Sequence, residues 1–199
     1  PGIMSHPHSS QAEALAWIAT HAASLDAGPE HADRLVPLLG AAGFFRIGVP
    51  LELGGSGGTT FDAVQAIARV AERSLTAAFV FWGQRCFIGY LLDSDNAALR
   101  QRWLPALLAG EVAGATGLSN AMKFLSGIEA LQVRGRPVTD GWHLEGRLHW
   151  VTNLHVDGFA VAAAARVAGS SAPLIVALDS ASAGVRRLVH VSALGADPA

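Results

Sequence analysis

The five residues from His149 to Asn153, which read HWVTN, place an indole ring and a hydroxyl group two positions apart. In a β-strand the side chains alternate between two faces, so a strand here would put Trp150 and Thr152 on the same face. A large flat ring beside a hydroxyl group could form one wall of a pocket for a flat ligand with polar edges. The same pair is also typical of ordinary sheet packing, and these residues alone leave both interpretations open.

Three other patterns carry less information. The loop from Gly54 to Gly58 precedes a predicted helix, but no strand comes before it and no Lys-Ser/Thr pair follows, which favours a structural turn over a phosphate site. The eight histidines include no helical pair with a nearby acid, so we predict no metal site. No nucleophile-elbow pattern supports a Ser-His-Asp hydrolase. The spacing of residues therefore assigns no catalytic residue.

The stretch GATGLSNAMKFLSGIEA lies where the sequence pattern changes from helical to strand-like. Leu118 and Ser119 are predicted to begin the second domain, and the small residues beside them would let a ligand approach the backbone. By itself this stretch is weak evidence for a binding site.

The composition narrows the class of protein. Of the 199 residues, 51% are hydrophobic and only 15% are charged, compared with roughly 25% charged in an average soluble domain. Either abundant alanine raises the apolar fraction, or part of the surface is normally covered by something absent from this chain. The net charge of −2 and the scattered basic residues argue against a nucleic-acid groove and against an anionic-membrane patch.

Signals of cellular location are sparse. Cys86 is the only cysteine, which fits a reducing cytoplasm. No uncharged apolar run reaches the roughly 18 residues that a membrane span needs, and the first residues show no signal peptide. We therefore expect a cytoplasmic protein with no membrane partner. Residues 1–9 are interpreted as a flexible tail that starts with a cloning scar before Met4.

Residues 10–110 carry the apolar periodicity of helices. Five helices are predicted, over about 10–26, from Pro29 to Gly40 or Gly43, from Thr60, over 75–92, and from Asp95 or Asn96, with a short closing turn from Pro105 to Gly110. The first begins with a capping box of Ser10 and Glu13. The apolar stripe predicted for the third consists of Val64, Ile67, Ala68 and Ala71. The fourth is apolar on nearly all sides and is predicted to be the buried centre of the helical domain.

Beyond residue 111, short apolar runs alternate with turn signals such as TDG, HVDG and GSSAP. The predicted strands read ALQVRG, WHLEG, LHWVTN, FAVAAAA, LIVALD and GVRRLVHV. The sequence therefore predicts an α+β protein. An all-α helical domain at 10–110 is followed by an antiparallel β-barrel or sandwich domain at 111–199, which could be incomplete.

Four motifs, taken together and in this order, resemble the acyl-CoA dehydrogenase family: AAGFFRIGVPLELGGSGG, QRWLPALLAGEVAGATGLS, SGIEA and HWVTN. The resemblance covers about residues 10–190. Members of the family are flavoenzymes with an N-terminal helical domain, a middle β-barrel and a C-terminal four-helix bundle. The resemblance implies FAD as the cofactor, with Trp150 beside the flavin, Thr152 near its reactive nitrogen, and Leu118 and Ser119 at its pyrimidine edge.

The resemblance also implies an activity. In the complete enzyme a base would remove the α-proton of an acyl-CoA or other small-molecule substrate while a hydride passes to the flavin, and an electron-transfer flavoprotein would take the electrons. The family's base, much of its FAD site and most of its oligomer interface come from the C-terminal bundle, which the resemblance does not reach. We therefore expect a homo-oligomer when complete and an inactive chain on its own. Glu52, Glu72 and Glu145 are interpreted as solvated or capping residues rather than as the base.

One departure from the family leaves other functions open. The stretch SNAMKFLSGI lacks the family's Gly-Ser-Asp turn and has Asn120 in place of a glutamate, which weakens the case for CoA binding. Ser126 is a candidate for the missing serine, but we do not assign it that role. Relatives of this family react reduced flavin with oxygen, so a flavin-dependent monooxygenase is one alternative. A non-catalytic, half-length subunit that completes a partner chain is another.

Overall fold

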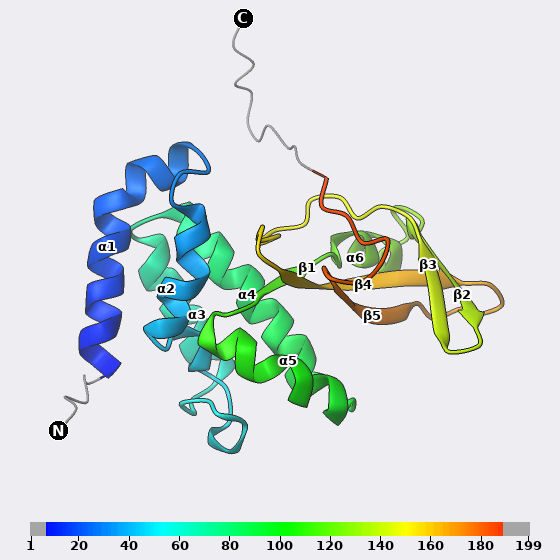
Figure 1. Cartoon of the computed structure of the whole chain (residues 1–199), viewed down its shortest axis with the longest axis horizontal. Coiled ribbons are helices and arrows are strands. Elements are labelled where there is room, and N and C mark those ends of the chain that lie inside the picture. Colours follow the sequence, from blue (N-terminus) through cyan, green and yellow to red (C-terminus); the bar gives the residue numbers. More distant parts are fainter. Residues whose placement is uncertain (1–6, 189–199) are drawn as a thin grey trace, which may run out of the picture. The chain divides into compact units, whose positions relative to one another are not determined.

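The computed structural model of the chain describes residues 7–188 (Figure 1). Contacts divide the chain into two compact units. The helical unit runs to Thr116 and includes Thr152–Ala160, whereas the sheet unit comprises Gly117–Val151 and resumes at Val161. The cloning scar predicted before Met4 lies outside the described residues.

The helical unit contains five α-helices and three short 3-10 helices among the described residues. The α-helices are α1 (Pro7–Ala27), α2 (Leu35–Ala41), α3 (Thr60–Ala71), α4 (Leu75–Asp93) and α5 (Ala97–Ala109). The 3-10 helices are η1 (Ala32–Arg34), η2 (Phe44–Arg46) and η3 (Leu51–Leu53). Helix α4 contacts α1, α2, α3 and α5, which confirms the prediction of a central helix at 75–92.

The interior of α4 combines large apolar side chains with two polar ones. Phe81, Phe87 and Ile88 are buried, and so are Gln84 and Arg85. Among the described helices, α4 alone is long and apolar enough to cross a bilayer, with a mean hydropathy of 1.3. Half of that window is buried inside the protein. A buried core helix passes the same test, so packing within the helical unit accounts for its composition.

Several helix boundaries differ from the predicted ones because tertiary contacts override local signals. Helix α1 begins at Pro7, so Ser10 lies inside the helix instead of capping it. Helix α2 begins at Leu35, after a 3-10 turn, and not at Pro29. The predicted closing turn at Pro105 is part of α5, which continues to Ala109. Pro105 is exposed, so the carbonyl group left without its helical partner can bond to water.

Helix α3 turns a different face inward from the one predicted. Its N-cap is Thr59, whereas the sequence predicted Thr60 as the capping residue. Its buried residues are Ala63, Ala66 and Val70, whereas Val64 of the predicted stripe is 54% exposed. Both sets recur at helical spacing, and small alanines on the inner face allow the close contact with α4.

The strands are β1 (Ala113–Thr116), β2 (Val133–Val138), β3 (Gly141–Glu145), β4 (Phe159–Val167) and β5 (Leu174–Asp179), and a sixth helix, α6, spans Ser119–Leu125. The sheet order is β1-β4-β2-β3, with β5 also paired to β4. Strands β2 and β3 form an antiparallel hairpin, in which Val138 pairs with Gly141. Strands β2 and β4 are parallel, with Val133 opposite Ala165.

The α+β prediction is therefore confirmed, with two refinements. The sheet is mixed rather than wholly antiparallel, and the described strands do not close into a barrel. Strand β3 returns the chain to the end where β2 begins, and the long connection between β3 and β4 carries it past β2 to the other side, where β4 runs parallel to β2.

Two predicted strands are not seen. Residues 185–188 of GVRRLVHV form no strand, and the rest of that stretch lies outside the described residues. The segment HWVTN is an irregular connection with one isolated bridge at Thr152. Trp150 and Asn153 both have positive φ, of 58° and 71°, which is incompatible with a regular strand. The prediction that Trp150 and Thr152 share one strand face is therefore wrong.

Helix α6 was not predicted, because its residues lie within the stretch assigned to the start of the β-domain. It buries Ala121 against Leu131 and Ala164, with Leu118 and Phe124 packed around this cluster. Strand β4 is buried at every position from Phe159 to Ala165, so its side chains show no inside-outside alternation.

Candidate functional site

Thr152 belongs to the helical unit and lies beside the end of β1. It forms an antiparallel bridge with Thr116. The hydroxyl oxygens of Thr116 and Tyr90 share a hydrogen bond of 2.9 Å. Burial raises the pKa of Tyr90, so its phenol stays protonated and able to donate at neutral pH. The neighbour across from Thr152 on α4 is Gly83, where an added Cβ would lie 3.6 Å from Thr152 Cγ2.

Asn153, the residue after Thr152, is held by two hydrogen bonds of its side chain. Its Nδ2 donates to Gln84 Oε1 at 3.1 Å and to the carbonyl oxygen of Gly114 at 2.9 Å. Its left-handed backbone is a conformation that asparagine adopts more readily than most residues. The two hydrogen bonds fix the backbone that follows Thr152 against α4 and β1.

Trp150 belongs to the sheet unit and is not part of a packed core. Its side chain is 71% exposed, and its φ of 58° is rare for a bulky residue. The aromatic face is therefore available to a ligand, and its position does not arise from sheet geometry.

Leu118 and Ser119 stand at the start of α6 in the sheet unit. Leu118 is the N-cap residue, and its half-buried side chain packs against the cluster of Ala121, Leu131 and Ala164. Ser119 is the first residue of the helix and is exposed. The structure places Leu118, Ser119 and Trp150 in one unit and Thr152 in the other.

The residues around Thr152 that sequence reasoning missed are Gly83, Gln84, Tyr90 and Thr116. Three of them come from α4, which the apolar pattern marked only as a core helix. Gln84 and Arg85 interrupt an otherwise apolar stretch, and that interruption was the available signal. A polar residue at the centre of a buried helix must find partners, so it indicates a local network.

The stretch around α6 uses its polar side chains internally. Asn120 Nδ2 donates to Glu129 Oε1 at 2.7 Å and to the carbonyl oxygen of Ala130 at 3.0 Å, and its Oδ1 accepts from the Gln132 amide at 3.0 Å. Ser126 Oγ donates back to the Met122 carbonyl oxygen at 2.9 Å. Neither side chain is left free to take the place of the missing Gly-Ser-Asp turn.

The glycine-rich loop is held by contacts of its own. The amide of Gly57 donates to the Val49 carbonyl oxygen at 2.9 Å, and a Cβ at Gly55 would lie less than 3.0 Å from the same oxygen. At the start of α3, Asp62 Oδ2 accepts from the amide and the hydroxyl of Thr59, both at 2.7 Å. The Thr59 hydroxyl is the main cause that lowers the pKa of Asp62. A carboxylate already occupies this helix start, which supports the structural-turn interpretation.

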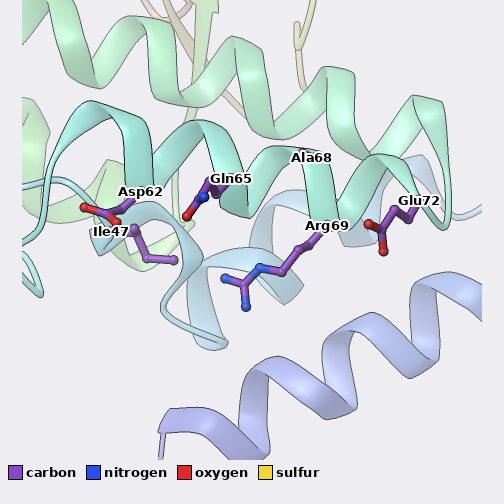
Figure 2. A pocket seen from close by; sticks show the side chains of 6 residues that line it. All are labelled: Ile47, Asp62, Gln65, Ala68, Arg69 and Glu72. Carbon is purple, nitrogen blue, oxygen red and sulfur yellow. The ribbon is translucent and has the colours of Figure 1, made fainter.

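A cavity of about 500 Å³ lies on the outer side of α3. Its lining residues are Ile47, Asp62, Gln65, Ala68, Arg69 and Glu72. Figure 2 shows Asp62, Gln65 and Arg69 projecting from α3 and Glu72 from its C-cap, with none of the predicted site residues among the labelled side chains. Among residues 7–188, no three His, Cys, Asp or Glu side chains are grouped so that they could hold a metal ion.

A helical unit followed by a small mixed sheet is the arrangement of the acyl-CoA dehydrogenase fold. The family model described as "Acyl-CoA dehydrogenase, N-terminal domain" matches residues 11–111. The chain belongs to the acyl-CoA dehydrogenase family.

Individual relatives agree with this assignment. The "Probable acyl-CoA dehydrogenase fadE25" of Mycobacterium leprae is 30% identical over 138 residues, which cover 68% of this chain and 35% of the relative. The chain thus spans about a third of the length of this curated relative. A Mycobacterium smegmatis structure assigned to the acyl-CoA dehydrogenases has a TM-score of 0.76 at 21% identity, covering 92% of this chain and 49% of that one. A glutaryl-CoA dehydrogenase of the same species, solved in complex with FADH2, has a TM-score of 0.71 at 18% identity, covering 89% and 46%.

Proposed function

We propose that this chain supplies the helical and sheet parts of an FAD-dependent, acyl-CoA dehydrogenase-like oxidoreductase. The observation that carries the proposal is the state of Trp150, which combines an exposed indole with a left-handed backbone. A left-handed bulky residue costs of order 1–2 kcal/mol, and exposing an indole forfeits the burial of a large apolar surface. Folding alone requires neither cost, and strained residues of this kind cluster at ligand sites.

The chain's own residues would bind and orient the cofactor. Trp150 would stack on the flavin and exclude water from one side of it. The Thr152 hydroxyl would donate a hydrogen bond near the reactive nitrogen, and the backbone of Leu118 and the hydroxyl of Ser119 would meet the pyrimidine edge. When bound, FAD supplies the acceptor for a hydride from the substrate. Ser119 fits a polar contact because its side chain is exposed.

The substrate and the partners belong to the same proposal. We infer an acyl-CoA or other small-molecule substrate, an electron-transfer flavoprotein as electron acceptor, and a cytoplasmic homo-oligomer. No catalytic base is assigned within the described residues. Glu52, Glu72 and Glu145 are all exposed, and Glu72 lies 3.5 Å from Arg73.

Titration of the purified chain with FAD tests the proposal. Binding is expected to give flavin absorption bands at about 370 and 450 nm that remain with the protein after gel filtration. Trp150→Ala removes the indole but keeps a Cβ and its strained backbone. It should weaken FAD binding roughly tenfold and change the free energy of unfolding by less than about 0.5 kcal/mol.

The matched control is Trp142→Ala on β3, whose indole is 44% exposed and was never predicted to meet the flavin. Equal FAD affinity of the two tryptophan variants would contradict the assignment of Trp150. A chain that acquires no flavin at all under these conditions would remove the proposal for this chain.

A flavin-dependent monooxygenase is the second candidate. It is favoured because the side chains of Asn120 and Ser126 are hydrogen-bonded within the stretch around α6. The stretch SNAMKFLSGI lacks the Gly-Ser-Asp turn with which the family contacts its cofactor and acyl-CoA, and these two side chains are not free to replace it. The discriminating measurement is the rate at which oxygen consumes reduced flavin in the FAD-loaded protein. Fast oxidation with incorporation of oxygen into an organic substrate favours this candidate, and slow oxidation favours the dehydrogenase.

A further inference from the structure

Gln84 is the centre of a buried hydrogen-bond network in the helical unit. Its side chain is fully buried near the middle of α4. Its Nε2 donates to the carbonyl oxygens of Leu107 at 3.0 Å and Val112 at 2.9 Å. Its Oε1 accepts from the Gly114 amide at 2.6 Å and from Asn153 Nδ2 at 3.1 Å. Both donors and both lone pairs of the amide are therefore used.

The network joins α4 to two later stretches of the chain, residues 107–114 and residue 153. Leu107 lies near the end of α5, Gly114 lies in β1, and Asn153 follows Thr152 in the returning segment. Asn153 closes the network because the same Nδ2 also donates to the Gly114 carbonyl oxygen at 2.9 Å. A single α4 side chain thus sets where β1 and residues 152–153 lie relative to each other.

The surroundings of the network leave little freedom for these segments. A Cβ at Gly114 would lie less than 3.0 Å from Phe87 Cβ, so β1 lies directly against α4. On the other side of Thr152 stands the bridge to Thr116. Thr152 is therefore held through Thr116 in β1 and through the backbone of Asn153, and both attachments depend on the position of β1.

An apolar side chain at position 84 would avoid burying an amide but would remove the partner of the Gly114 amide and of the Leu107 and Val112 carbonyl oxygens. Fully satisfied polar networks are rigid and define one arrangement of the parts that they join. We propose that Gln84 is a positioning residue, which holds β1 and Asn153 so that the Thr152 hydroxyl keeps one fixed direction. The role of that hydroxyl rests on the proposed function, whereas the positioning itself is a property of the chain without FAD.

The first test measures the positioning in the chain without FAD, by hydrogen exchange. Gln84→Met keeps the length of the side chain and removes all four hydrogen bonds. It should accelerate hydrogen exchange in peptides that cover 113–116 and 152–155. The increase in rate should be about tenfold larger than the increase that the loss of global stability accounts for. The matched control is Ile88→Val, also buried in α4, which removes one methylene group and no hydrogen bond. It should change global stability without this local excess.

Asn153→Ala removes the same contact from the other side and keeps the test decisive if Gln84→Met does not fold. It should accelerate exchange at 152–155 in the same way. In the double variant the two changes should add less than their separate effects, because each removes the shared bond between Gln84 and Asn153. Full additivity, or an equal local effect of Ile88→Val, would overturn the positioning role.

The second test uses FAD and a readout that packing alone does not move. Gln84→Met should shift the reduction potential of the bound flavin and change its absorption spectrum, whereas Ile88→Val should leave both as in the unaltered chain. A normal potential in Gln84→Met with altered hydrogen exchange would separate Gln84 from flavin chemistry and overturn its link to Thr152. If the unaltered chain binds no FAD, the proposed function fails, and the hydrogen-exchange comparison still decides the positioning.

Discussion

Asp26 shows how one side chain joins two helices of the unit. Its carboxylate accepts from the Ser74 hydroxyl at 2.6 Å and from the amides of Thr76 at 2.9 Å and Leu75 at 3.3 Å. Ser74 in turn accepts from the Ala77 amide at 3.1 Å as the N-cap of α4. The end of α1 thereby satisfies the unpaired amides at the start of the central helix.

The pKa of Asp26 makes this contact dependent on pH. Burial raises the pKa, but the hydrogen bonds from Ser74, Thr76 and Leu75 together lower it below the ordinary value. A carboxylate with a lowered folded-state pKa contributes its stability above the unfolded-state pKa of about 3.9 and loses it as the pH falls through the folded-state value.

Asp26→Ala is therefore expected to lower the free energy of unfolding by about 1 kcal/mol at pH 7. The difference from the unaltered chain should shrink below about pH 4, because the carboxylate is protonated first in the unfolded chain and in the folded chain only at a lower pH. Urea unfolding at pH 7 and at pH 3 measures both values. Asp140→Ala, in the exposed turn between β2 and β3, is the control, and an equal loss from both variants would contradict the capping role.

At the scale of elements, α3 shows what periodicity can decide and what it leaves open. Apolar spacing located the helix, but Val64 and Val70 both fit a helical stripe on different faces. Tertiary contacts with α4 selected the face of Val70. Phe61 and Leu75 are exposed nearby, at 67% and 68%, so part of the high apolar content of the chain lies on its surface.

The two valines of α3 provide a direct comparison. Val70→Ala should lower the free energy of unfolding by roughly 2 kcal/mol, because it leaves a cavity at a fully buried position. Val64→Ala should change it by less than about 0.5 kcal/mol, because the side chain is in solvent. Thermal and urea unfolding of both variants measure the difference. A larger loss from Val64→Ala than from Val70→Ala would support the buried stripe that the sequence predicted.

The contact between α2 and α5 depends on a glycine that the sequence marked only as a helix stop. A Cβ at Gly40 would lie less than 3.0 Å from the Ala109 carbonyl oxygen. Gly40→Ala should therefore destabilise the protein by about 1–3 kcal/mol in urea unfolding, although alanine favours helices more than glycine does. Gly28→Ala is the control, because no atom lies within 4 Å of its added Cβ. A Gly40→Ala variant as stable as the control would show that the two helices can move apart.

Much of the fold could be predicted, because its signals are local. The central helix, the cap at Asn96 and the four strands β2 to β5 follow from apolar runs and turn residues. Helix α6 could not be predicted in the same way, since its burial depends on Leu131 and Ala164 from later in the chain. The partners of Thr152 also come from distant segments, and no spacing rule connects Gln84 with Asn153 across 69 positions.

At the scale of the whole molecule, the division into units does not follow the chain in two consecutive blocks. The predicted domains met near residue 110, whereas the contacts of the helical unit continue to Thr116 and include Thr152–Ala160. His155 strengthens this return, because its Nε2 lies 3.0 Å from the carbonyl oxygen of Asp33. The helical unit is therefore completed by residues that follow the first part of the sheet.

A chain that ends at Thr116 should consequently be less stable than the helical unit of the whole chain. It loses both hydrogen bonds of Asn153, each of which contributes about 1 kcal/mol. The midpoint of thermal unfolding, followed by helical circular dichroism, should fall by roughly 5 to 10 °C. A separate peptide of residues 150–160, added in excess, should recover part of the loss. An unchanged midpoint in the shortened chain would show that the returning segment contributes little.

The buried alanines of β4 limit the size of the side chains that this strand can accept. Ala160 and the run from Ala162 to Ala165 are buried, and Gly117 has no room for a Cβ beside the Ala162 carbonyl oxygen. A strand enclosed this closely contains no spare volume, so each added methylene must displace a neighbouring backbone. In a saturation library selected for folded protein, this strand should tolerate glycine, alanine and serine and reject leucine or phenylalanine.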